Sequence, residues 1–304
     1  MNTALVMQEL LKILPPDRVL KDQPMSRHTS FKIGGPADFL ALPQTPQQLA
    51  RIIDFCNNNG VFVKVIGNGS NLLVSDRGIS GVIVKTTEMK QITQIAPTTV
   101  RAQSGAILAR LANFCKDLAL TGLEFAHGIP GTVGGAVYMN AGAYDGEICG
   151  VLTKSTVLDK DLNTIILANP EHEFAYRHSV FVDNPELIIL ESEFELAPGD
   201  PEKIKAKMDD FSARRTEKQP LNLPSAGSTF KRPDGDYASR LVDVCGLSGC
   251  TIGGASVSPK HAGFIVNNGG ATFEDVTRLI QHVKDTVYEQ QGIMLECEVL
   301  IIDR

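Results

Sequence analysis

Residues 128–146 form the segment that most constrains how this chain can fold. The segment GIPGTVGGAVYMNAGAYDG holds six glycines in nineteen positions, whereas the average glycine content of the chain would place fewer than two there. Glycine costs about 0.5–1 kcal/mol inside a regular helix or strand, so a dense cluster indicates backbone that passes close to another group. A shorter segment at 65–74, VIGNGSNLLV, repeats the pattern on a smaller scale.

The two segments together predict a binding site for an extended phosphorylated ligand. Backbone N–H groups in glycine-rich turns can bind a diphosphate without a lysine. GNGSN alone could equally be a tight hairpin turn. The second loop is less easily explained as a turn, since ordered loops of that length are usually functional. The pair therefore favours a dinucleotide over a mononucleotide.

Length, composition and charge limit the class of protein. A chain of 304 residues usually divides into two or three domains, and 43% apolar with 21% charged residues is typical of globular proteins. We find no apolar stretch long enough to span a bilayer and no signal peptide, and therefore expect a cytoplasmic protein that does not bind a membrane. The net charge of −6, with no basic tract beyond Arg214–Arg215, argues against a nucleic-acid partner.

Cysteines and histidines do not predict a metal site. The six cysteines are scattered, and none forms a CxxC pair. Cys245 and Cys250 lack the spacing and the neighbouring histidines of a zinc site. His178 and His261 are not within ligand spacing of another histidine, so we expect ordinary polar residues, reduced thiols and no metal.

Hydrophobic spacing predicts helices and strands in the first part of the chain. Four leucines define the buried face of an N-terminal helix: Leu5, Leu10, Leu11 and Leu14. A strand at 39–42 precedes a helix with Thr45 as N-cap and Pro46 at its first position. That helix would bury Leu49, Ile52, Ile53 and Cys56 and end at Asn59–Gly60. Strands at 61–66 and 82–85 flank the first glycine loop, and no GxGxxG motif opens a helix, which distinguishes this unit from a Rossmann domain.

Short strands dominate the middle of the chain. They are predicted at 100–104, 154–158, 164–167, 187–191 and 193–196, around a helix at 108–118. A helix at 202–216 follows, between the proline-rich connections 198–201 and 219–224. The second connection is the best candidate for a domain boundary.

The last part of the chain predicts a helix at 237–244, strands at 252–257 and 263–267, and one long helix. Thr272 and Asp275 form a capping box at its start, and Gly292 ends it. Its buried stripe is Val276, Leu279, Ile280, Val283 and Val287. The final strand, 294–302, alternates, which predicts that Leu295, Cys297, Val299 and Ile301 share one face.

Ser228 is the first of three polar residues that could carry chemistry. It follows Ala226 and Gly227, which do not crowd it. The surrounding sequence lacks the GxSxG motif of a hydrolase nucleophile, so proton transfer is the chemistry it would perform. The alternative is a turn serine that bonds to local backbone.

Glu298 and Arg177 are the other two polar residues that could carry chemistry. Glu298 has apolar neighbours on both faces of its predicted strand, so it is either an edge residue in water or an acid placed for function. A buried carboxyl could donate a proton or stabilise a developing anion. Arg177, within FAYRHS, either stacks on Tyr176 or Phe174 or binds a carboxylate through its guanidinium. The sequence leaves these alternatives open.

Six segments of this sequence form an ordered set of motifs: TSFKIGGPA (29–37), GNGSNLLVSD (67–76), GLEFAHGIPGTVGGAVYMNAGAYDGE (122–147), FAYRHS (174–179), PSAGSTFKRP (224–233) and LECEVLI (295–301). In sequence and in order they resemble the UDP-N-acetylenolpyruvoylglucosamine reductases, which make UDP-N-acetylmuramate for bacterial peptidoglycan and thereby serve cell-wall biogenesis, cell shape and division. The resemblance covers nearly the whole chain.

The resemblance implies an α+β fold with three domains. Two of them would form a vanillyl-alcohol-oxidase (PCMH)-type FAD-binding module, at 1–86 and 87–219, and the third, at 220–297, would be a smaller α+β domain that binds substrate. The last strand, 298–304, is a candidate to return to the first domain.

The resemblance also implies site residues. FAD would be held by the two loops, through Gly67, Asn68, Gly69, Ser70, Asn71, Leu72, Gly128, Pro130, Gly131, Gly134, Gly135, Asn140 and Gly142. Related oxidases often carry a histidine near Asn71, so we expect the FAD here to be non-covalent. Substrate contacts would come from Lys218, Arg232 and His261, with Lys218, beside Arg214 and Arg215, a candidate for the UDP phosphates.

The implied reaction has two stages. NADPH reduces FAD, and the flavin N5 then delivers hydride to C3 of the enolpyruvyl group. Arg177 and Glu298 would stabilise the carbanion or enol at C2, and Ser228 would supply the proton to C2. A cation beside the developing charge is most effective where water is excluded, and a serine can serve as acid when the geometry is preset. We expect a monomer with only small-molecule partners.

Two departures and two alternatives remain. Arg177 and Ser228 are about fifty residues apart, too close for the substrate-covering loop of one family branch, so the chain resembles the shorter second type, and its closure over UDP stays open. Many members carry Asn where Arg232 stands.

The alternative functions are a related FAD-dependent oxidase of a small hydroxy acid or alcohol, and a flavin- or nucleotide-binding module without turnover. A proton donor and an arginine–glutamate pair favour the reductase, since an oxidase needs a base.

Overall fold

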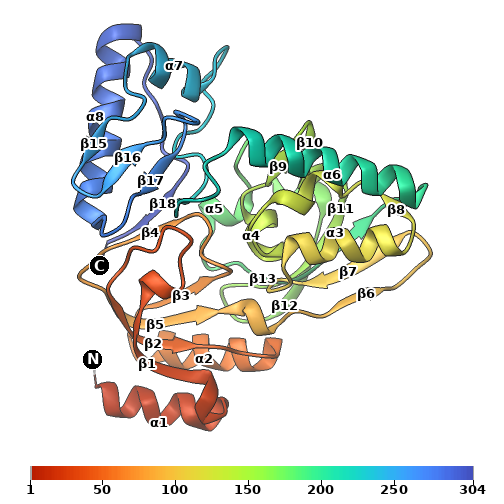
Figure 1. The fold of residues 1–304 in the computed structure, drawn as a ribbon. Coiled ribbons are helices and arrows are strands. Elements are labelled where there is room, and N and C mark those ends of the chain that lie inside the picture. Colours follow the sequence, from red (N-terminus) through yellow and green to blue (C-terminus); the bar gives the residue numbers. More distant parts are fainter. Residues whose placement is uncertain (1, 304) are drawn as a thin grey trace. The chain divides into compact units, whose positions relative to one another are not determined.

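The structure, a computed structural model, describes residues 2–303, which cluster into two compact units (Figure 1). Unit 1 contains residues 2–21, 39–68 and 81–214, and unit 2 contains 22–38, 69–80 and 215–303. The last segment of unit 2 begins close to the proline-rich connection at 219–224. The division into three domains stays a prediction. No helix within the described residues has both the length and the hydropathy that crossing a membrane requires.

A four-stranded sheet with the order β1-β2-β5-β3 begins the fold, and most of its residues belong to unit 1. The elements around it are α1 (Thr3–Ile13), β1 (Val19–Pro24), β2 (Pro36–Ala41), α2 (Pro46–Asn58), β3 (Val63–Ile66) and β5 (Ile79–Lys85). Both helices share a buried core with the sheet. The predicted start of α2 is confirmed, because the Thr45 side chain accepts from the Gln48 N–H and Pro46 is the first helical residue. Its predicted buried face is confirmed in full.

The predicted N-terminal helix exists, but its buried face was partly wrong. Leu5 and Leu11 are 39% and 40% exposed, whereas Val6, Leu10 and Leu14 are buried. Positions four apart lie on one face of a helix, so the stripe that packs on the core passes through residues 6, 10 and 14. Leu5 and Leu11 lie beside that stripe.

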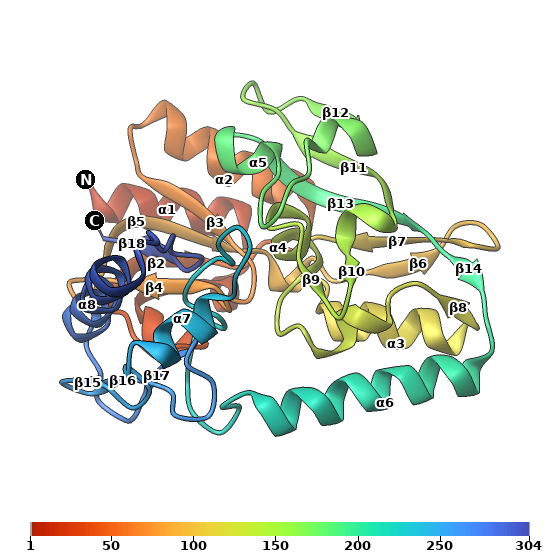
Figure 2. The same cartoon turned by 90° about the horizontal axis from the view of Figure 1, so that it is seen from above.

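Unit 1 continues with a five-stranded antiparallel sheet of order β12-β11-β13-β7-β6. The elements are β6 (Ile92–Gln94), β7 (Thr99–Gln103), α3 (Leu108–Asp117), α4 (Val133–Tyr138), β11 (Leu152–Leu158), β12 (Thr164–Ala168), β13 (Ile188–Glu195) and α6 (Pro201–Lys218). Apolar side chains of α3, α4 and α6 share a core with β7, β11 and β13. Figure 2 shows α6 as one long, straight helix, as its sequence pattern predicted.

The strands predicted at 187–191 and 193–196 are one continuous strand, β13. Ser192, the polar residue between them, does not interrupt it, because its hydroxyl bonds to the Ser155 hydroxyl on β11 at 2.9 Å. A buried polar group with a partner is tolerated inside a sheet.

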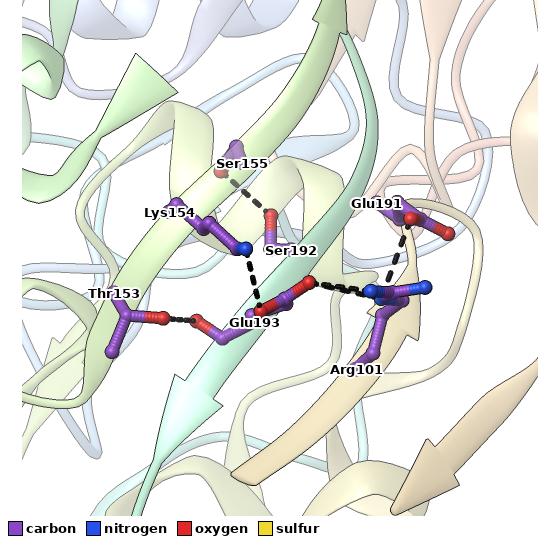
Figure 3. Close-up of polar contacts among 7 residues, drawn as sticks. All are labelled: Arg101, Thr153, Lys154, Ser155, Glu191, Ser192 and Glu193. Atoms are coloured by element: carbon purple, nitrogen blue, oxygen red, sulfur yellow. Dashed lines mark hydrogen bonds and ion pairs between the residues drawn. The ribbon is translucent and has the colours of Figure 1, made fainter. Parts of the chain in front are cut away.

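The charged positions of this sheet pair across strands (Figure 3). Glu193 on β13 accepts from Arg101 on β7 at 2.7 Å and lies 3.2 Å from Lys154 on β11. The register of β11 shifts between Leu152 and Lys154, and the hydroxyl of the intervening Thr153 bonds to the Glu193 carbonyl. Cross-strand pairing thus holds the central strand between its two neighbours.

Smaller elements complete unit 1. They are β8 (Leu120–Thr121) paired with β14 (Ala197–Pro198), the hairpin of β9 (Gly142–Ala143) and β10 (Gly146–Glu147), the short helix α5 (Val180–Asp183), and 3-10 turns at 16–18, 86–88, 124–128, 148–150 and 169–172.

Unit 2 has a three-stranded antiparallel sheet and a long helix, α8 (Phe273–Gln291). Its other elements are β4 (Leu72–Val74), α7 (Ala238–Val244), β15 (Thr251–Ile252), β16 (Ala255–Val257), β17 (Ile265–Asn267), β18 (Leu300–Ile302) and a 3-10 turn at 25–27. The capping box of Thr272 and Asp275 is confirmed, as is the end at Gly292, which has φ +70°. All five predicted core residues of α8 are buried.

Two predictions in unit 2 were wrong. The strand expected at 252–257 is the hairpin β15–β16, because Gly253 takes φ +54° and the Gly254 N–H donates to the Asp275 carboxylate. The final strand changes partner along its length: Phe230 bridges Cys297 in antiparallel fashion, whereas β18 pairs with β4 in parallel. The alternation therefore breaks, and Ile301 is 46% exposed while Ile302 is buried.

Candidate functional site

The first glycine loop, which follows β3, has backbone donors that the protein does not use. Within residues 2–303, the N–H groups of Gly67, Asn68, Gly69 and Ser70 donate no hydrogen bond. The loop carbonyls are engaged instead: that of Gly69 accepts from the Ser30 N–H and that of Ser70 from the Ser30 hydroxyl. A row of consecutive unpaired amides fits a phosphate-type anion.

Close packing explains both loop glycines. A Cβ at Gly67 would lie 2.2 Å from Oγ1 of Thr132, and a Cβ at Gly69 would lie 2.0 Å from the His28 carbonyl oxygen. Gly69 also has φ +69°, which strains other residues. Gly67 thus brings the first loop against the second, as a ligand cradle would require. Leu72, at the end of the loop, is buried in β4 and offers no polar side chain.

The second glycine loop uses its donors differently from what we expected. The Val133 and Gly134 N–H groups donate to the carbonyls of Ala106 and Ser104, and the Gly135 N–H donates to Oγ1 of Thr132. These amides at the start of α4 are therefore occupied inside the protein. A Cβ at Gly134 would lie 2.8 Å from Cβ of Ser104, so this glycine serves helix packing.

The remaining predicted residues of the second loop also have internal roles. Gly128 ends a 3-10 turn, Pro130 has no N–H to donate, and Gly131 donates to the Ile129 carbonyl. Gly142 pairs with Glu147 in the β9–β10 hairpin. Its close packing against Glu147, which would lie 2.6 Å from an added Cβ, explains the glycine.

Asn140 lies at the end of this loop, and every hydrogen-bonding group of its side-chain amide has a partner in the protein. Its Oδ1 accepts from the Cys149 N–H at 3.0 Å, and its Nδ2 donates to Glu147 and to the Ala175 carbonyl at 3.1 Å each. The residue is only 1% exposed. Its amide is therefore committed to the protein, and a direct cofactor contact by this side chain is not what the geometry favours.

Arg177 lies in a tight turn and stacks on an aromatic neighbour, the first of the two interactions considered for it. Its guanidinium stacks on the Tyr176 ring with 4.9 Å to the centroid, and its NH2 donates to the Gly142 carbonyl at 3.0 Å. Its NH1 lies 4.0 Å from Oε1 of Glu147. The side chain is mostly buried against the second loop, where a cation would act on a carboxylate more strongly than in water.

Ser228 and Glu298 belong to unit 2, where their segments pair. The Glu298 N–H donates to the Thr229 carbonyl at 2.8 Å, and the Lys231 N–H donates to the Glu296 carbonyl at 2.9 Å. Ser228 directly precedes this paired stretch, and both residues are half-buried. The Asn71 amide donates to the Glu298 carbonyl at 3.0 Å, so the first glycine loop also holds the Glu298 backbone.

A cavity of about 440 Å³ in unit 2 contains one of the three predicted substrate residues. Its lining is Tyr237, Ser239, Arg240, Asp243, Ser248, Pro259, Lys260, His261 and Ala262. Burial lowers the pKa of His261, and its Nδ1 accepts from the Gly263 N–H. The neutral ring therefore carries its proton on Nε2 and can donate from there.

Arg232 and Lys218 lie outside that lining. The Arg232 guanidinium stacks on the Tyr237 ring at 4.4 Å, which connects it to a residue of the cavity. Lys218 is exposed at the end of α6. Arg214 pairs with Asp210 and Arg215 bonds to Gln219, so the side chains of both arginines already have partners inside the protein.

Sequence reasoning missed Thr132 and Glu147. Thr132 directly precedes α4, at the position where an N-cap is expected, so its capping role could have been predicted from the sequence. Glu147 contacts residues up to thirty positions away, and no local pattern shows such a contact.

Two family descriptions match the chain. Residues 219–302 match the C-terminal domain of UDP-N-acetylenolpyruvoylglucosamine reductase, and residues 37–164 match an FAD binding domain. The curated UDP-N-acetylenolpyruvoylglucosamine reductase of Caldanaerobacter subterraneus subsp. tengcongensis is 46% identical over 298 residues, which are 98% of this chain and 98% of that protein. The chain belongs to the UDP-N-acetylenolpyruvoylglucosamine reductase family.

Further relatives agree with membership of the UDP-N-acetylenolpyruvoylglucosamine reductase family. The Clostridium botulinum protein of that name is 49% identical over 286 residues, covering 94% of this chain and 93% of its own. The crystal structure of the Thermus caldophilus reductase superposes with a TM-score of 0.80 at 32% identity, over 94% of this chain and 99% of that one.

A more distant structure confirms the fold class. p-Cresol methylhydroxylase matches with a TM-score of 0.51 at 14% identity, over 97% of this chain and 65% of its own. At that identity only the fold is shared. The predicted α+β fold with a vanillyl-alcohol-oxidase (PCMH)-type FAD-binding module is confirmed.

Proposed function

We infer that this chain is an FAD-dependent enzyme that reduces UDP-N-acetylenolpyruvoylglucosamine to UDP-N-acetylmuramate with NADPH as reductant. The observation that carries this inference is the identity to curated reductases over almost the full length of both chains. The loop amides at 67–70 support it, because their unpaired donors suit the diphosphate of a dinucleotide. We further propose that the enzyme acts as a cytoplasmic monomer on this small-molecule substrate, in peptidoglycan precursor synthesis.

The residues that would hold FAD follow from the loop geometry. Gly67, Asn68, Gly69 and Ser70 would donate their N–H groups to the diphosphate. Thr132 would act indirectly, by fixing the start of α4 against Gly67. When bound, FAD supplies the hydride-transfer chemistry that no side chain can perform. Binding is non-covalent in this proposal.

Arg177 would stabilise negative charge on the substrate. Reduction of an enol ether conjugated to a carboxylate places charge on that carboxylate, and a guanidinium can bind it through two parallel hydrogen bonds. The Arg177 side chain is already oriented by Tyr176 and Gly142, so little reorganisation is needed when charge develops.

Ser228 would give the proton to C2, and Glu298 would assist at the same carbon. The backbone pairing of 229–231 with 296–298 places their segments side by side. Rigid backbone on both segments supports proton transfer, because a weak acid such as serine needs a preset geometry.

The UDP group is proposed to contact the cavity of unit 2. His261 can donate from Nε2, and Lys260 adds positive charge to the same lining, where Arg240 pairs with Asp236. Arg232 stacks on Tyr237 at that lining and would serve the phosphates, together with Lys218.

Steady-state turnover tests this proposal. We expect NADPH to be consumed only when UDP-N-acetylenolpyruvoylglucosamine is present, with UDP-N-acetylmuramate detected by mass spectrometry. Oxygen consumption with a small hydroxy acid or alcohol, in the absence of NADPH, would instead identify an oxidase. A protein that takes up no FAD would contradict both functions.

A further inference from the structure

Arg177 occupies a backbone conformation that needs outside support. The Ala175 and His178 backbones exchange two hydrogen bonds of 3.2 Å, so Arg177 is the third residue of a four-residue turn, and its φ is +53°. Glycine is the usual residue at that position of a turn with positive φ. A non-glycine residue there costs roughly 1–3 kcal/mol and persists only where surrounding contacts hold it.

Asn140 supplies that support from outside the turn. Its Nδ2 donates to the Ala175 carbonyl at 3.1 Å, which fixes the first residue of the turn. The same Nδ2 donates to Oε2 of Glu147 at 3.1 Å, and the other oxygen of Glu147 lies 4.0 Å from NH1 of Arg177. One buried amide thus restrains the Arg177 backbone through Ala175 and its guanidinium through Glu147.

The third contact of Asn140 fixes the amide itself. Its Oδ1 accepts from the Cys149 N–H at 3.0 Å, which determines which end of the side chain is the donor. Both N–H bonds and the carbonyl are then used, and the residue is 1% exposed. These contacts leave the side chain no free group for a ligand.

We propose that Asn140 is a positioning residue for Arg177, acting through Ala175 and Glu147 rather than through the cofactor. The proposal rests on the proposed role of Arg177 at the substrate carboxylate. Misplacement of such a group by about 1 Å can cost about a hundredfold in rate. The expected consequence is a defect confined to the step in which the substrate reoxidises the flavin.

The test compares Asn140→Asp with Asn169→Asp. Aspartate keeps the acceptor for Cys149 but replaces the donor with an oxygen that faces Glu147 and the Ala175 carbonyl. Asn169 is the control, because its Nδ2 also donates to two carbonyls, those of Cys149 and Leu152, and its side chain forms no hydrogen bond with residues 175–178 among the described residues. FAD content and the rate of flavin reduction by NADPH are measured first, to establish that each variant is folded and loaded.

We expect Asn140→Asp to reduce flavin within a few-fold of the parent rate and to slow reoxidation by the enolpyruvyl substrate about tenfold to a hundredfold. Asn169→Asp should leave both steps near the parent rate. Unchanged reoxidation in Asn140→Asp would overturn the proposal. Loss of bound FAD alone would also overturn it and would return Asn140 to cofactor binding.

A double variant separates positioning from general damage. If Asn140 acts through Arg177, the variant Arg177→Ala with Asn140→Asp should be no slower than Arg177→Ala alone, because the interaction is already lost. Multiplying effects would contradict the proposal. If Arg177→Ala itself leaves reoxidation unchanged, the proposed function of Arg177 fails independently of Asn140.

Discussion

Ser228 directly precedes a stretch of backbone that pairs with another segment of unit 2. The stretch after Ser228 is bonded to 296–298, and Asn71 bonds to the Glu298 carbonyl, so the backbone that follows the proposed proton donor and the Glu298 backbone are both held. A turn serine that only bonds locally would need none of this. Kinetics of the two half-reactions test the proton-transfer role.

Ser228→Ala separates the two roles considered for this serine. We expect the variant to keep flavin reduction by NADPH and to lose about 10²–10⁴-fold in reoxidation by the enolpyruvyl substrate, the range of general-acid steps. Ser80→Ala is the control, since Ser80 is an exposed serine of the same unit whose hydroxyl bonds to Asp38. Stopped-flow measurement of both half-reactions decides. Two fast half-reactions in Ser228→Ala would mean that Ser228 is a turn residue.

His172 is a buried titratable residue that the proposed reaction does not use. Its Nδ1 contacts the Ala168 carbonyl, so that nitrogen carries the proton and Nε2 accepts from the Ser155 hydroxyl, each at 2.9 Å. Ser155 and Ser192 bond in turn, which continues the chain into the sheet. Burial lowers the pKa of His172 below its ordinary value, so the folded protein holds this ring neutral.

The lowered pKa of His172 predicts that the free energy of unfolding falls in mild acid. The unfolded chain binds a proton at His172 as the pH falls below about 6.5, whereas the folded chain does not until its lowered pKa is reached. Stability should therefore be fully present above about pH 6.5 and decline below it, by at most about 1.4 kcal/mol per pH unit from this group. Urea unfolding at a series of pH values, for the parent and His172→Gln, isolates the effect. An identical pH dependence in both proteins would contradict it.

At the scale of elements, the glycine loops differ in what they do. The first loop keeps a row of free donors, and the second uses its donors to fix α4 against the 104–106 segment. Both require glycine, the first where Gly67 meets Thr132 and the second where Gly134 meets Ser104. The shared composition thus has two physical causes.

Gly67→Ala tests the first loop. The added Cβ would lie 2.2 Å from Oγ1 of Thr132, so the loop must shift, and overpacking of that kind costs about 1–3 kcal/mol. We expect FAD to bind about tenfold to a hundredfold more weakly, measured by fluorescence titration of the FAD-free protein. Gly150→Ala is the matched control, because nothing lies within 4 Å of its added Cβ. Equal FAD affinity in the two variants would contradict the proposal that the loop at 67–70 binds the FAD diphosphate.

The sequence predicted those elements whose signals are local. The start of α2 was predicted from Thr45 and Pro46, and the start of α8 from Thr272 and Asp275. The spacing of apolar residues predicted the buried faces of both helices. The final strand was mispredicted because its partner changes from 229–231 to β4, and no alternation pattern contains that change.

The candidate site divides in the same way. The glycine loops could be located from composition, but the roles of Arg177, Ser228 and Glu298 came from a family resemblance. The contact of Asn140 with Ala175 joins residues thirty-five positions apart, and only the folded chain brings them together. Such a contact has no signature in a single sequence.

At the scale of the whole molecule, the proposed roles are distributed over both units. Arg177 belongs to unit 1, and Ser228 and Glu298 belong to unit 2. The family relationship spans nearly the full chain, and one family description matches in each half: an FAD binding domain over 37–164 and the reductase C-terminal domain over 219–302. The function therefore has to be tested on the intact protein.

An anaerobic single-turnover experiment tests the central claim most directly. The FAD-loaded protein is reduced with one equivalent of NADPH until the visible flavin absorbance is lost, and UDP-N-acetylenolpyruvoylglucosamine is then added. We predict that the absorbance returns and that one equivalent of UDP-N-acetylmuramate forms. A flavin that stays bleached with this substrate, and recovers only when oxygen is admitted, would contradict the account.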